Sequence, residues 1–320
     1  MNVPFFTFRD FPAGLQEKVQ QALVQAVEEK EYILGSRVKQ FEQDFATYLG
    51  CRFVTGTGNG YDALMIGLRA LGLAAGDEVI VPANSFVATA NAVVNLGAKP
   101  VFADPDPSTC NLTAQQALPH LTPRTKALLP VHLFGQACEM EELMALAENQ
   151  GLAVVEDFAQ SQGARYKGRM TGTFGQVGAT SFYPVKNLGA LGDGGALVTN
   201  EVGLAEFIQK YHNYGQTSKY LVELPGVNSR LDTLQAAVLL EKLAVLDLLN
   251  QERQRIAGLY HRELAGVGDL VLPVTAPFCE HVYHIYSVSS AQRDTLQEYL
   301  AEQNILTLVH YPIPIHLQEG

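Results

Sequence analysis

The strongest constraint on the fold is an alternation of short apolar runs with helical stretches between residues 52 and 200. Four runs predict buried strands and two intervening stretches predict helices: strands at 78–82, 99–104, 127–133 and 153–157, helices at 86–95 and 140–149. Such alternation indicates parallel strands joined by helical crossovers that cover both faces of a sheet. We therefore expect an α/β protein with a mainly parallel sheet sandwiched by helices, and a ligand site at the carboxyl ends of its strands.

The flanking segments indicate an N-terminal helix and a second, smaller domain. Apolar residues three and four apart predict a helix over 15–33, and a nearly all-apolar pattern predicts one long helix over 231–249, suited to a domain junction or subunit contact. After it come an alternating strand-like run at 281–289, a helical pattern at 291–303 and an apolar run at 305–309. We expect a large domain over 1–245 and a small C-terminal domain over 246–320.

Composition excludes several classes of function. A net charge of −11 argues against nucleic acid or an anionic membrane as the main partner. No apolar run has membrane-spanning length and the first residues lack a signal-peptide layout, so we expect a cytoplasmic protein. The four cysteines form no Cys-x-x-Cys pair and the histidines show no ligand spacing, so we expect reduced thiols and no metal site.

A glycine-rich loop precedes a helical run that ends near Ala70. The loop contains Gly56, Gly58 and Gly60, and glycines at a helix start allow backbone N–H groups to approach an anion such as phosphate. The spacing differs from the dinucleotide fingerprint and the loop has no P-loop lysine. A tight turn into a helix explains the same pattern equally well.

Lys186 is the candidate reactive residue. It follows an apolar run, precedes the glycine-rich stretch 189–195 and has no carboxylate nearby in sequence. Such surroundings favour a desolvated amine, which is more often neutral and nucleophilic and suits imine formation. A surface lysine that merely follows a strand is the alternative.

The glycine loop, Asp157 and Lys186 together match the needs of a pyridine cofactor with a phosphate arm. Asp157 ends its predicted strand, so its carboxylate lies at the ligand-binding edge. The loop anchors the phosphate, the carboxylate keeps the ring nitrogen protonated, and the lysine holds the aldehyde as an imine. Phe86 is a candidate to stack on the ring or a core residue. Gln160 is a candidate contact for the ring hydroxyl.

The chain resembles the DegT/StrS-type sugar aminotransferases, a branch of the fold-type I pyridoxal-phosphate enzymes. The matching motifs run in family order over nearly the whole chain, at 58–64, 86–89, 156–160, 181–189, 192–195 and 226–230. The resemblance implies pyridoxal 5′-phosphate as cofactor, with a Schiff base at Lys186. The other contacts that it implies are Asp157 to the pyridine nitrogen, Phe86 to the ring, Gln160 to its hydroxyl, and Gly60, Tyr61 and Ser181 to the phosphate.

The resemblance also implies a homodimer with shared active sites, because in this family the residue matching Asn228 reaches the phosphate of the neighbouring subunit. Stretches 212–220 and 310–316 resemble members that act on nucleotide-linked 3-keto-6-deoxyhexoses, with glutamate as amino donor. We therefore favour a dTDP-linked 3-keto sugar over a 4-keto sugar. Family members continue with a further strand and helices after 310–316, so we expect the small domain to be incomplete.

Four tyrosine and lysine residues are candidate contacts for the sugar or nucleotide, although structural roles explain them equally well: Tyr183, Lys219, Tyr220 and Tyr311. Three other functions remain as alternatives. A sugar dehydratase of the same scaffold carries histidine at the imine position, so Lys186 argues against it. A regulatory protein that binds the cofactor without turnover lacks support from any basic patch. A nicotinamide dehydrogenase is disfavoured by the spacing of the glycine loop.

Overall fold

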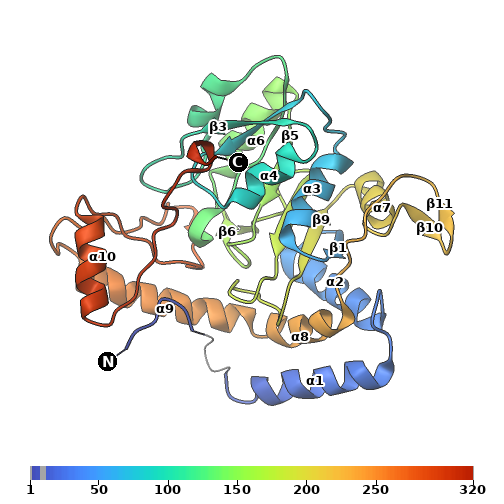
Figure 1. Ribbon diagram of the computed structural model, residues 1–320, viewed down its shortest axis with the longest axis horizontal. Coiled ribbons are helices and arrows are strands. Elements are labelled where there is room, and N and C mark those ends of the chain that lie inside the picture. Colours follow the sequence, from blue (N-terminus) through green and yellow to red (C-terminus); the bar gives the residue numbers. More distant parts are fainter. Residues whose placement is uncertain (1, 8–11, 320) are drawn as a thin grey trace.

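The computed structural model describes residues 2–7 and 12–319, and its centre is a seven-stranded sheet (Figure 1). The strands lie in the order β1-β9-β8-β5-β4-β2-β3. They are β1 Phe53–Thr57, β2 Glu78–Pro82, β3 Lys99–Ala103, β4 Thr125–Leu128, β5 Ala153–Asp157, β8 Val177–Ser181 and β9 Gly195–Thr199. Strands β8, β5, β4, β2 and β3 pair in parallel, and only β9 runs antiparallel to its neighbours β1 and β8. The predicted α/β architecture is confirmed.

Helices cover both faces of this sheet because its strands are apolar on both sides. In β2, Val79 and Val81 join the core under α3, α4 and α7, whereas Ile80 faces α5 and α6 on the opposite side. The helices concerned are α2 Ser36–Leu49, α3 Gly60–Ala70, α4 Val87–Val94, α5 Ala114–Ala117, α6 Met140–Gln150, α7 Val202–Tyr211 and α8 Thr233–Leu243. Together α2 and α8 bury Phe41, Phe45 and their neighbours against β1 and β9.

The remaining elements lie around this core. Helix α1, Leu15–Glu29, packs along α8, and the hairpin β10–β11 projects from the opposite side of the body to α10 (Figure 1). The others are α9 Leu246–Leu264, α10 Arg293–Glu302, β6 Arg165–Tyr166, β7 Arg169–Met170, β10 Gln216–Ser218, β11 Leu221–Val222, β12 Cys279–Glu280, η1 Leu118–His120, η2 Leu133–Gly135 and η3 Ile315–Leu317. Every helix in the described ranges is too short or too polar to cross a lipid bilayer.

The prediction of one helix over 231–249 was wrong. Helix α8 ends at Leu243 and α9 begins at Leu246, with Val245 at φ −122° and ψ 9° between them. No glycine or proline marks the break, so apolar periodicity continues across it and conceals it. Whether this break also separates two domains, as the 1–245 and 246–320 division predicts, remains a prediction.

Two predicted strands in the last part of the chain are absent from the structure that we describe. In 281–289 only Ser289 pairs, with Val271, and in 305–309 only Ile305 pairs, with Val3. Alternation of apolar residues selects one buried face, but a strand also needs a neighbouring strand for its hydrogen bonds. The predicted strand at 127–133 instead begins at Thr125 and ends at Leu128, shortly before Pro130, which lacks a backbone N–H.

Candidate active site

Asp157 and Lys186 lie at the carboxyl edge of the sheet. Asp157 ends β5, and β8, the parallel neighbour of β5, leads into the turn that holds Lys186. This turn is tight, because a Cβ at Gly189 would come within 2.4 Å of the Pro184 carbonyl oxygen. Burial lowers the pKa of the Lys186 amine to about 8, against the opposing pull of the Asp157 charge. The amine is therefore neutral in an appreciable fraction of molecules near neutral pH.

The carboxylate of Asp157 is buried and held by two donors. The Thr89 hydroxyl donates to Oδ2 at 2.9 Å and the Ala159 N–H donates to Oδ1 at 3.1 Å. Burial raises the pKa of Asp157, and the two hydrogen bonds and the charge of Lys186 oppose that rise. A buried carboxylate of this kind is stabilised further when a cationic group lies beside it.

A second buried carboxylate fixes the backbone beneath Asp157. Glu156 accepts hydrogen bonds from the N–H groups of Gly172, Phe174 and Gly175 and contacts Nε2 of His132 at 2.9 Å. The N–H of His132 in turn donates to the Asp157 carbonyl oxygen at 3.0 Å. The end of β5 is therefore anchored on both sides, which limits the positions that the Asp157 side chain adopts.

The glycine loop places the start of α3 against Ser181. Asn59 caps the helix by accepting from the Asp62 N–H at 2.8 Å, and Gly60 is the first helical residue. A Cβ at Gly60 would lie 2.5 Å from the Ser181 Cβ, so only glycine allows this approach. The first N–H groups of a helix have no intrahelical acceptor, and here they share one edge with the Ser181 hydroxyl. This pair is suited to form a cradle for an anion.

Gln160 links this edge to the C-terminal segment. Its Oε1 accepts from the Phe134 N–H at 2.8 Å, and its Nε2 donates to the Tyr311 hydroxyl at 3.3 Å. The rings of Tyr311 and Phe86 lie 6.3 Å apart. Phe86 is 56% exposed although its side chain is large and apolar, so it is not a core residue. Its open ring is available to stack on a flat ligand.

Several predicted site residues lie apart from this cluster. Lys219 and Tyr220 sit in the β10–β11 hairpin, where the Lys219 ammonium lies 5.3 Å from the centre of the Tyr220 ring, and Tyr220 is 86% exposed. Asn228 is exposed and its backbone bridges Asn213. Tyr183 is exposed, but its carbonyl oxygen accepts from the Lys186 N–H at 2.8 Å.

The side chain of Tyr61 does not join the anion cradle, because Asn95 donates to its hydroxyl at 2.5 Å on the flank of α3. Only its backbone N–H, in the first turn, remains at the cradle.

Thr89, Ser229 and Asn59 were given no role in the sequence analysis. Ser229 accepts from the Gly58 N–H at 3.0 Å and donates to Asp62 at 2.6 Å, which fixes the glycine loop. Thr89 could have been identified from the sequence as a hydroxyl that lies one helical turn after Phe86, near the same edge of the sheet.

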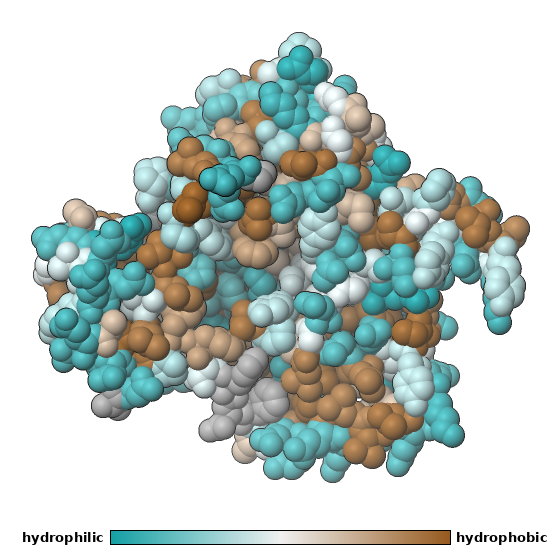
Figure 2. All heavy atoms as spheres, in the orientation of Figure 1, coloured by the Kyte–Doolittle hydropathy of each residue, from teal (hydrophilic) through white to brown (hydrophobic). Residues whose placement is uncertain are grey.

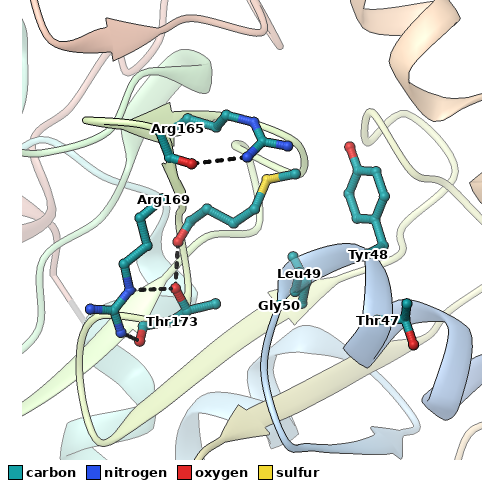
Figure 3. A pocket seen from close by; sticks show the side chains of 9 residues that line it. Thr47, Tyr48, Leu49, Gly50, Arg165, Arg169 and Thr173 are labelled. Atoms are coloured by element: carbon teal, nitrogen blue, oxygen red, sulfur yellow. Dashed lines mark hydrogen bonds between the residues drawn. The ribbon is translucent and has the colours of Figure 1, made fainter.

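A separate hollow of about 350 Å³ lies between the end of α2 and the β6–β7 turn (Figure 3). Its two guanidinium groups are engaged by their own turn, since Arg165 donates to the Gly168 carbonyl at 2.9 Å and Arg169 to the Thr173 hydroxyl at 3.1 Å. None of the predicted site residues lines it. Among the residues that the structure describes, no cluster of His, Cys, Asp or Glu could hold a metal ion.

The cluster at the sheet edge fits pyridoxal 5′-phosphate. The cradle at Gly60 and Ser181 suits the phosphate, the open ring of Phe86 suits the pyridine face, and Asp157 suits a protonated ring nitrogen. A half-buried lysine whose pKa is lowered suits an aldehyde. Fold and site together fit the class of fold-type I pyridoxal-phosphate enzymes.

Comparison with known proteins gives the family. The sequence profile of the DegT/DnrJ/EryC1/StrS aminotransferase family matches residues 14–320. The chain is 44% identical over 316 residues to the dTDP-3-amino-3,4,6-trideoxy-alpha-D-glucose transaminase of Streptomyces venezuelae, covering 99% of this chain and 83% of that protein. It is 45% identical over 318 residues to the dTDP-3-amino-3,6-dideoxy-alpha-D-galactopyranose transaminase of Aneurinibacillus thermoaerophilus, covering 99% and 87%.

The crystal structure of DesV from S. venezuelae, in complex with a ketimine intermediate, superimposes with a TM-score of 0.97 at 44% identity, covering 99% of this chain and 86% of that chain. The chain therefore belongs to the DegT/DnrJ/EryC1/StrS aminotransferase family. The resemblance noted from the motifs is confirmed, and so is the expectation of a sugar aminotransferase. Family membership also removes the nicotinamide dehydrogenase from consideration.

Proposed function

We propose that this protein binds pyridoxal 5′-phosphate at Lys186 and moves an amino group from glutamate to the ketone of a dTDP-linked 3-keto-6-deoxyhexose. The observation that carries the proposal is the placement of a buried Asp157 and of Lys186, whose pKa is lowered to about 8, at the ends of two neighbouring parallel strands. The two relatives at 44% and 45% identity, both named as transaminases of dTDP-3-amino sugars, support the 3-keto substrate over a 4-keto substrate.

When bound, the cofactor supplies an aldehyde that captures amines and a ring that withdraws electrons from the carbon beside the amine. The chain supplies the proton transfers. Lys186 removes the proton from the α-carbon of glutamate as a neutral amine and returns it as an ammonium, acting as general base and then general acid. The Asp157 carboxylate keeps a proton on the ring nitrogen, and Gln160 positions the ring through its hydroxyl.

Tyr183 and Tyr311 are proposed to contact the sugar, because Tyr183 adjoins Lys186 and Tyr311 adjoins Gln160 and Phe86. The Lys186 N–H donates to the Tyr183 carbonyl oxygen, and the Tyr311 hydroxyl accepts from Gln160. Lys219 and Tyr220 are proposed to contact the nucleotide of the neighbouring subunit, since their hairpin projects away from the body of its own chain (Figure 1).

The proposed assembly is a homodimer with shared active sites. Figure 2 shows hydrophobic side chains gathered over α1 and α8, and Val24 and Val27 of α1 are exposed. Ile33 and Leu191 are exposed too and lie beside α8, since Ile33 pairs with Asp232 and the Leu191 N–H donates to Gln235. Apolar surface of this kind favours contact with another protein surface. Asn228 is exposed as well, so a second copy can receive its side chain.

The test is an assay of purified protein with glutamate and matched nucleotide sugars. We expect visible absorbance from the bound cofactor, its bleaching by glutamate, and recovery of the absorbance on addition of a dTDP-3-keto-6-deoxyhexose. Recovery with the 4-keto isomer alone would replace the proposed substrate. Visible absorbance that glutamate leaves unchanged would contradict turnover and favour a regulatory protein that only binds the cofactor.

A further inference from the structure

A second buried lysine, Lys242 of α8, contacts the turn that carries Lys186. Its amine donates a hydrogen bond of 2.6 Å to the carbonyl oxygen of Gly189. The apolar residues beside it in α8 belong to the same buried core cluster as Leu188 and Ala190 of the turn. The proposed proton transfers give Lys242 no role of its own, although it joins α8 to the proposed reactive residue through only a few backbone atoms.

The turn is closed at its two limbs. The Ala190 N–H donates to the Phe182 carbonyl oxygen at 2.7 Å, so the ends of the turn are joined. A Cβ at Gly189 would lie 2.4 Å from the Pro184 carbonyl oxygen, which shows that the limbs also touch further along. Because the limbs are in contact, a displacement of the Gly189 carbonyl moves the backbone that carries Lys186.

Two side chains of α8 hold this turn. Lys242 bonds to Gly189, and Oε1 of Gln235 accepts from the Leu191 N–H at 2.9 Å. Gln235 precedes Lys242 by seven residues, which is about two turns of an α-helix, so both side chains project from the same face of α8. A Cβ at Gly192 would lie 3.1 Å from Nε2 of Gln235, so the second contact is also close. Helix α8 therefore supports the turn at two points.

A lysine that only filled space at this position would not need its amine. Burial of an amine disfavours its charged form, and the pKa of Lys242 is lowered to about 8 for that reason. Methionine has a flexible side chain of similar length and carries no such group. The hydrogen bond to the Gly189 carbonyl offsets part of the cost of burial and gives the amine a defined position. The contact therefore indicates a function for the amine itself.

We propose that Lys242 is a positioning residue for the aminotransferase reaction, and that its hydrogen bond to Gly189 holds the turn in the position from which the Lys186 amine reacts. This inference rests on the proposed function of Lys186. That amine takes a proton from one carbon and returns it to another, and a misplacement of about 1 Å in a reacting group lowers rates about 100-fold. Lys242 acts through the turn and not by contact with the reacting atoms.

Three substitutions separate positioning from packing. Lys242→Met keeps a long side chain and removes the donor, whereas Lys242→Arg keeps a donor. Val238→Ala is the matched control, because Val238 is a buried residue of the same helix that packs against Leu15 and Val19 of α1, in a different core cluster from the turn. It loosens α8 and leaves both hydrogen bonds to the turn in place.

The first measurement follows the turn itself, in full-length protein from which the cofactor has been removed. Hydrogen exchange of the peptide over 183–190 is recorded by mass spectrometry relative to the peptide over β2, which corrects for changes in global stability. This ratio should rise about tenfold in Lys242→Met, because a buried hydrogen bond is lost. It should return to the wild-type value in Lys242→Arg and keep that value in Val238→Ala.

The second measurement is the reaction of the cofactor-loaded protein with glutamate, followed by the loss of visible absorbance. Lys242→Met should lower the maximal rate constant about tenfold and leave the apparent dissociation constant for glutamate unchanged, since the reactive amine is displaced. The kinetic isotope effect with α-deuterated glutamate should rise, because proton transfer becomes slower than the other steps. A residue that only stabilised the fold would change the amount of active protein and neither of these quantities.

Three results would overturn the proposal: exchange and rate constants of Lys242→Met equal to those of the wild type, the same changes in Val238→Ala, or no recovery of either quantity in Lys242→Arg. Failure of the proposed function gives a different result. Wild-type protein would then show no visible absorbance with pyridoxal phosphate, or no response to glutamate, while the exchange measurement would still report on the contact between Lys242 and the turn.

Discussion

The Thr89 hydroxyl donates a hydrogen bond of 2.9 Å to Oδ2 of Asp157, across the gap between the first turn of α4 and the end of β5. Burial alone would favour the neutral acid, and this donor is one of two that favour the carboxylate instead. Thr89 also contacts the Ser85 hydroxyl at 3.2 Å, so its own position is fixed. The charge state of Asp157 therefore depends on a residue that need not touch the cofactor.

Thr89→Val should raise the pKa of Asp157 further, because a hydrogen bond to the charged form is lost. In the proposed site pyridoxal phosphate binds the carboxylate form of Asp157, so the pH below which affinity falls should be higher in the variant than in the wild type. Binding titrations from pH 4 to pH 8 measure this. Thr89→Ser keeps the hydroxyl and is the matched control. An unchanged acid limb in Thr89→Val would contradict the assignment.

Gly60→Ala should weaken cofactor affinity at least about tenfold, since the new methyl group would press on Ser181 and displace one side of the phosphate cradle. Gly203 is the matched control, because it lies in the first turn of α7 with open space around it. Equilibrium binding of pyridoxal phosphate to both variants, with circular dichroism to check folding, makes the comparison. Equal affinities would show that the cradle lies elsewhere.

Stability of the cofactor-free protein should depend on pH through Lys186. Its folded pKa of about 8 is below the unfolded value of 10.5, so the unfolded chain binds more protons between these values and the folded state gains stability as pH rises through this window. Below pH 8 the folded state bears the whole cost of the buried charge. Lys186→Met removes this dependence.

The measurement is the unfolding free energy of both proteins in urea at pH 7 and pH 9.5. At pH 7 the Met variant should be more stable than the wild type, because it carries no charge at this site. This difference in unfolding free energy should shrink by about 1 to 2 kcal/mol at pH 9.5, a range reduced for the partial exposure of the Lys186 side chain. Lys242, whose pKa burial also lowers to about 8, is present in both proteins and cancels. A difference that does not vary with pH would place the Lys186 amine in water.

Shared active sites predict complementation between two inactive variants. Asn228→Asp would set a negative charge against the phosphate, and Lys186→Ala would remove the reactive amine. In a mixed dimer one site would carry both substitutions and the other neither, so a co-refolded mixture should recover about a quarter of wild-type activity. Recovery to that level is expected only if Asn228 acts across the interface. A mixture as inactive as its components would contradict the shared site.

Most of the sheet could be predicted from the sequence, because buried parallel strands consist of continuous apolar runs. Strands β2 and β5 have the predicted bounds for this reason, and α6 lies within one residue of its prediction. The strand predictions at 281–289 and 305–309 were wrong because a strand needs a pairing partner, which no local pattern specifies. The break at Val245 was not predicted because neither glycine nor proline accompanies it.

The candidate site divides in the same way. Asp157 and Lys186 were predictable from strand ends and local composition. The Thr89 donor and the Ser229 contact to the glycine loop join residues that are 68 and 171 positions apart. Only the folded chain brings such pairs together, so these contacts cannot be predicted from the spacing of residues in the sequence.

The most direct test of the account is the site of covalent attachment. The purified protein is treated with pyridoxal phosphate and borohydride, digested and analysed by peptide mass spectrometry. The account predicts the mass of a reduced pyridoxyl-phosphate group on the peptide that contains Lys186, and on no peptide of Lys186→Ala. Attachment at Lys242 or any other lysine, or an unmodified Lys186 in protein that turns over glutamate, would contradict it.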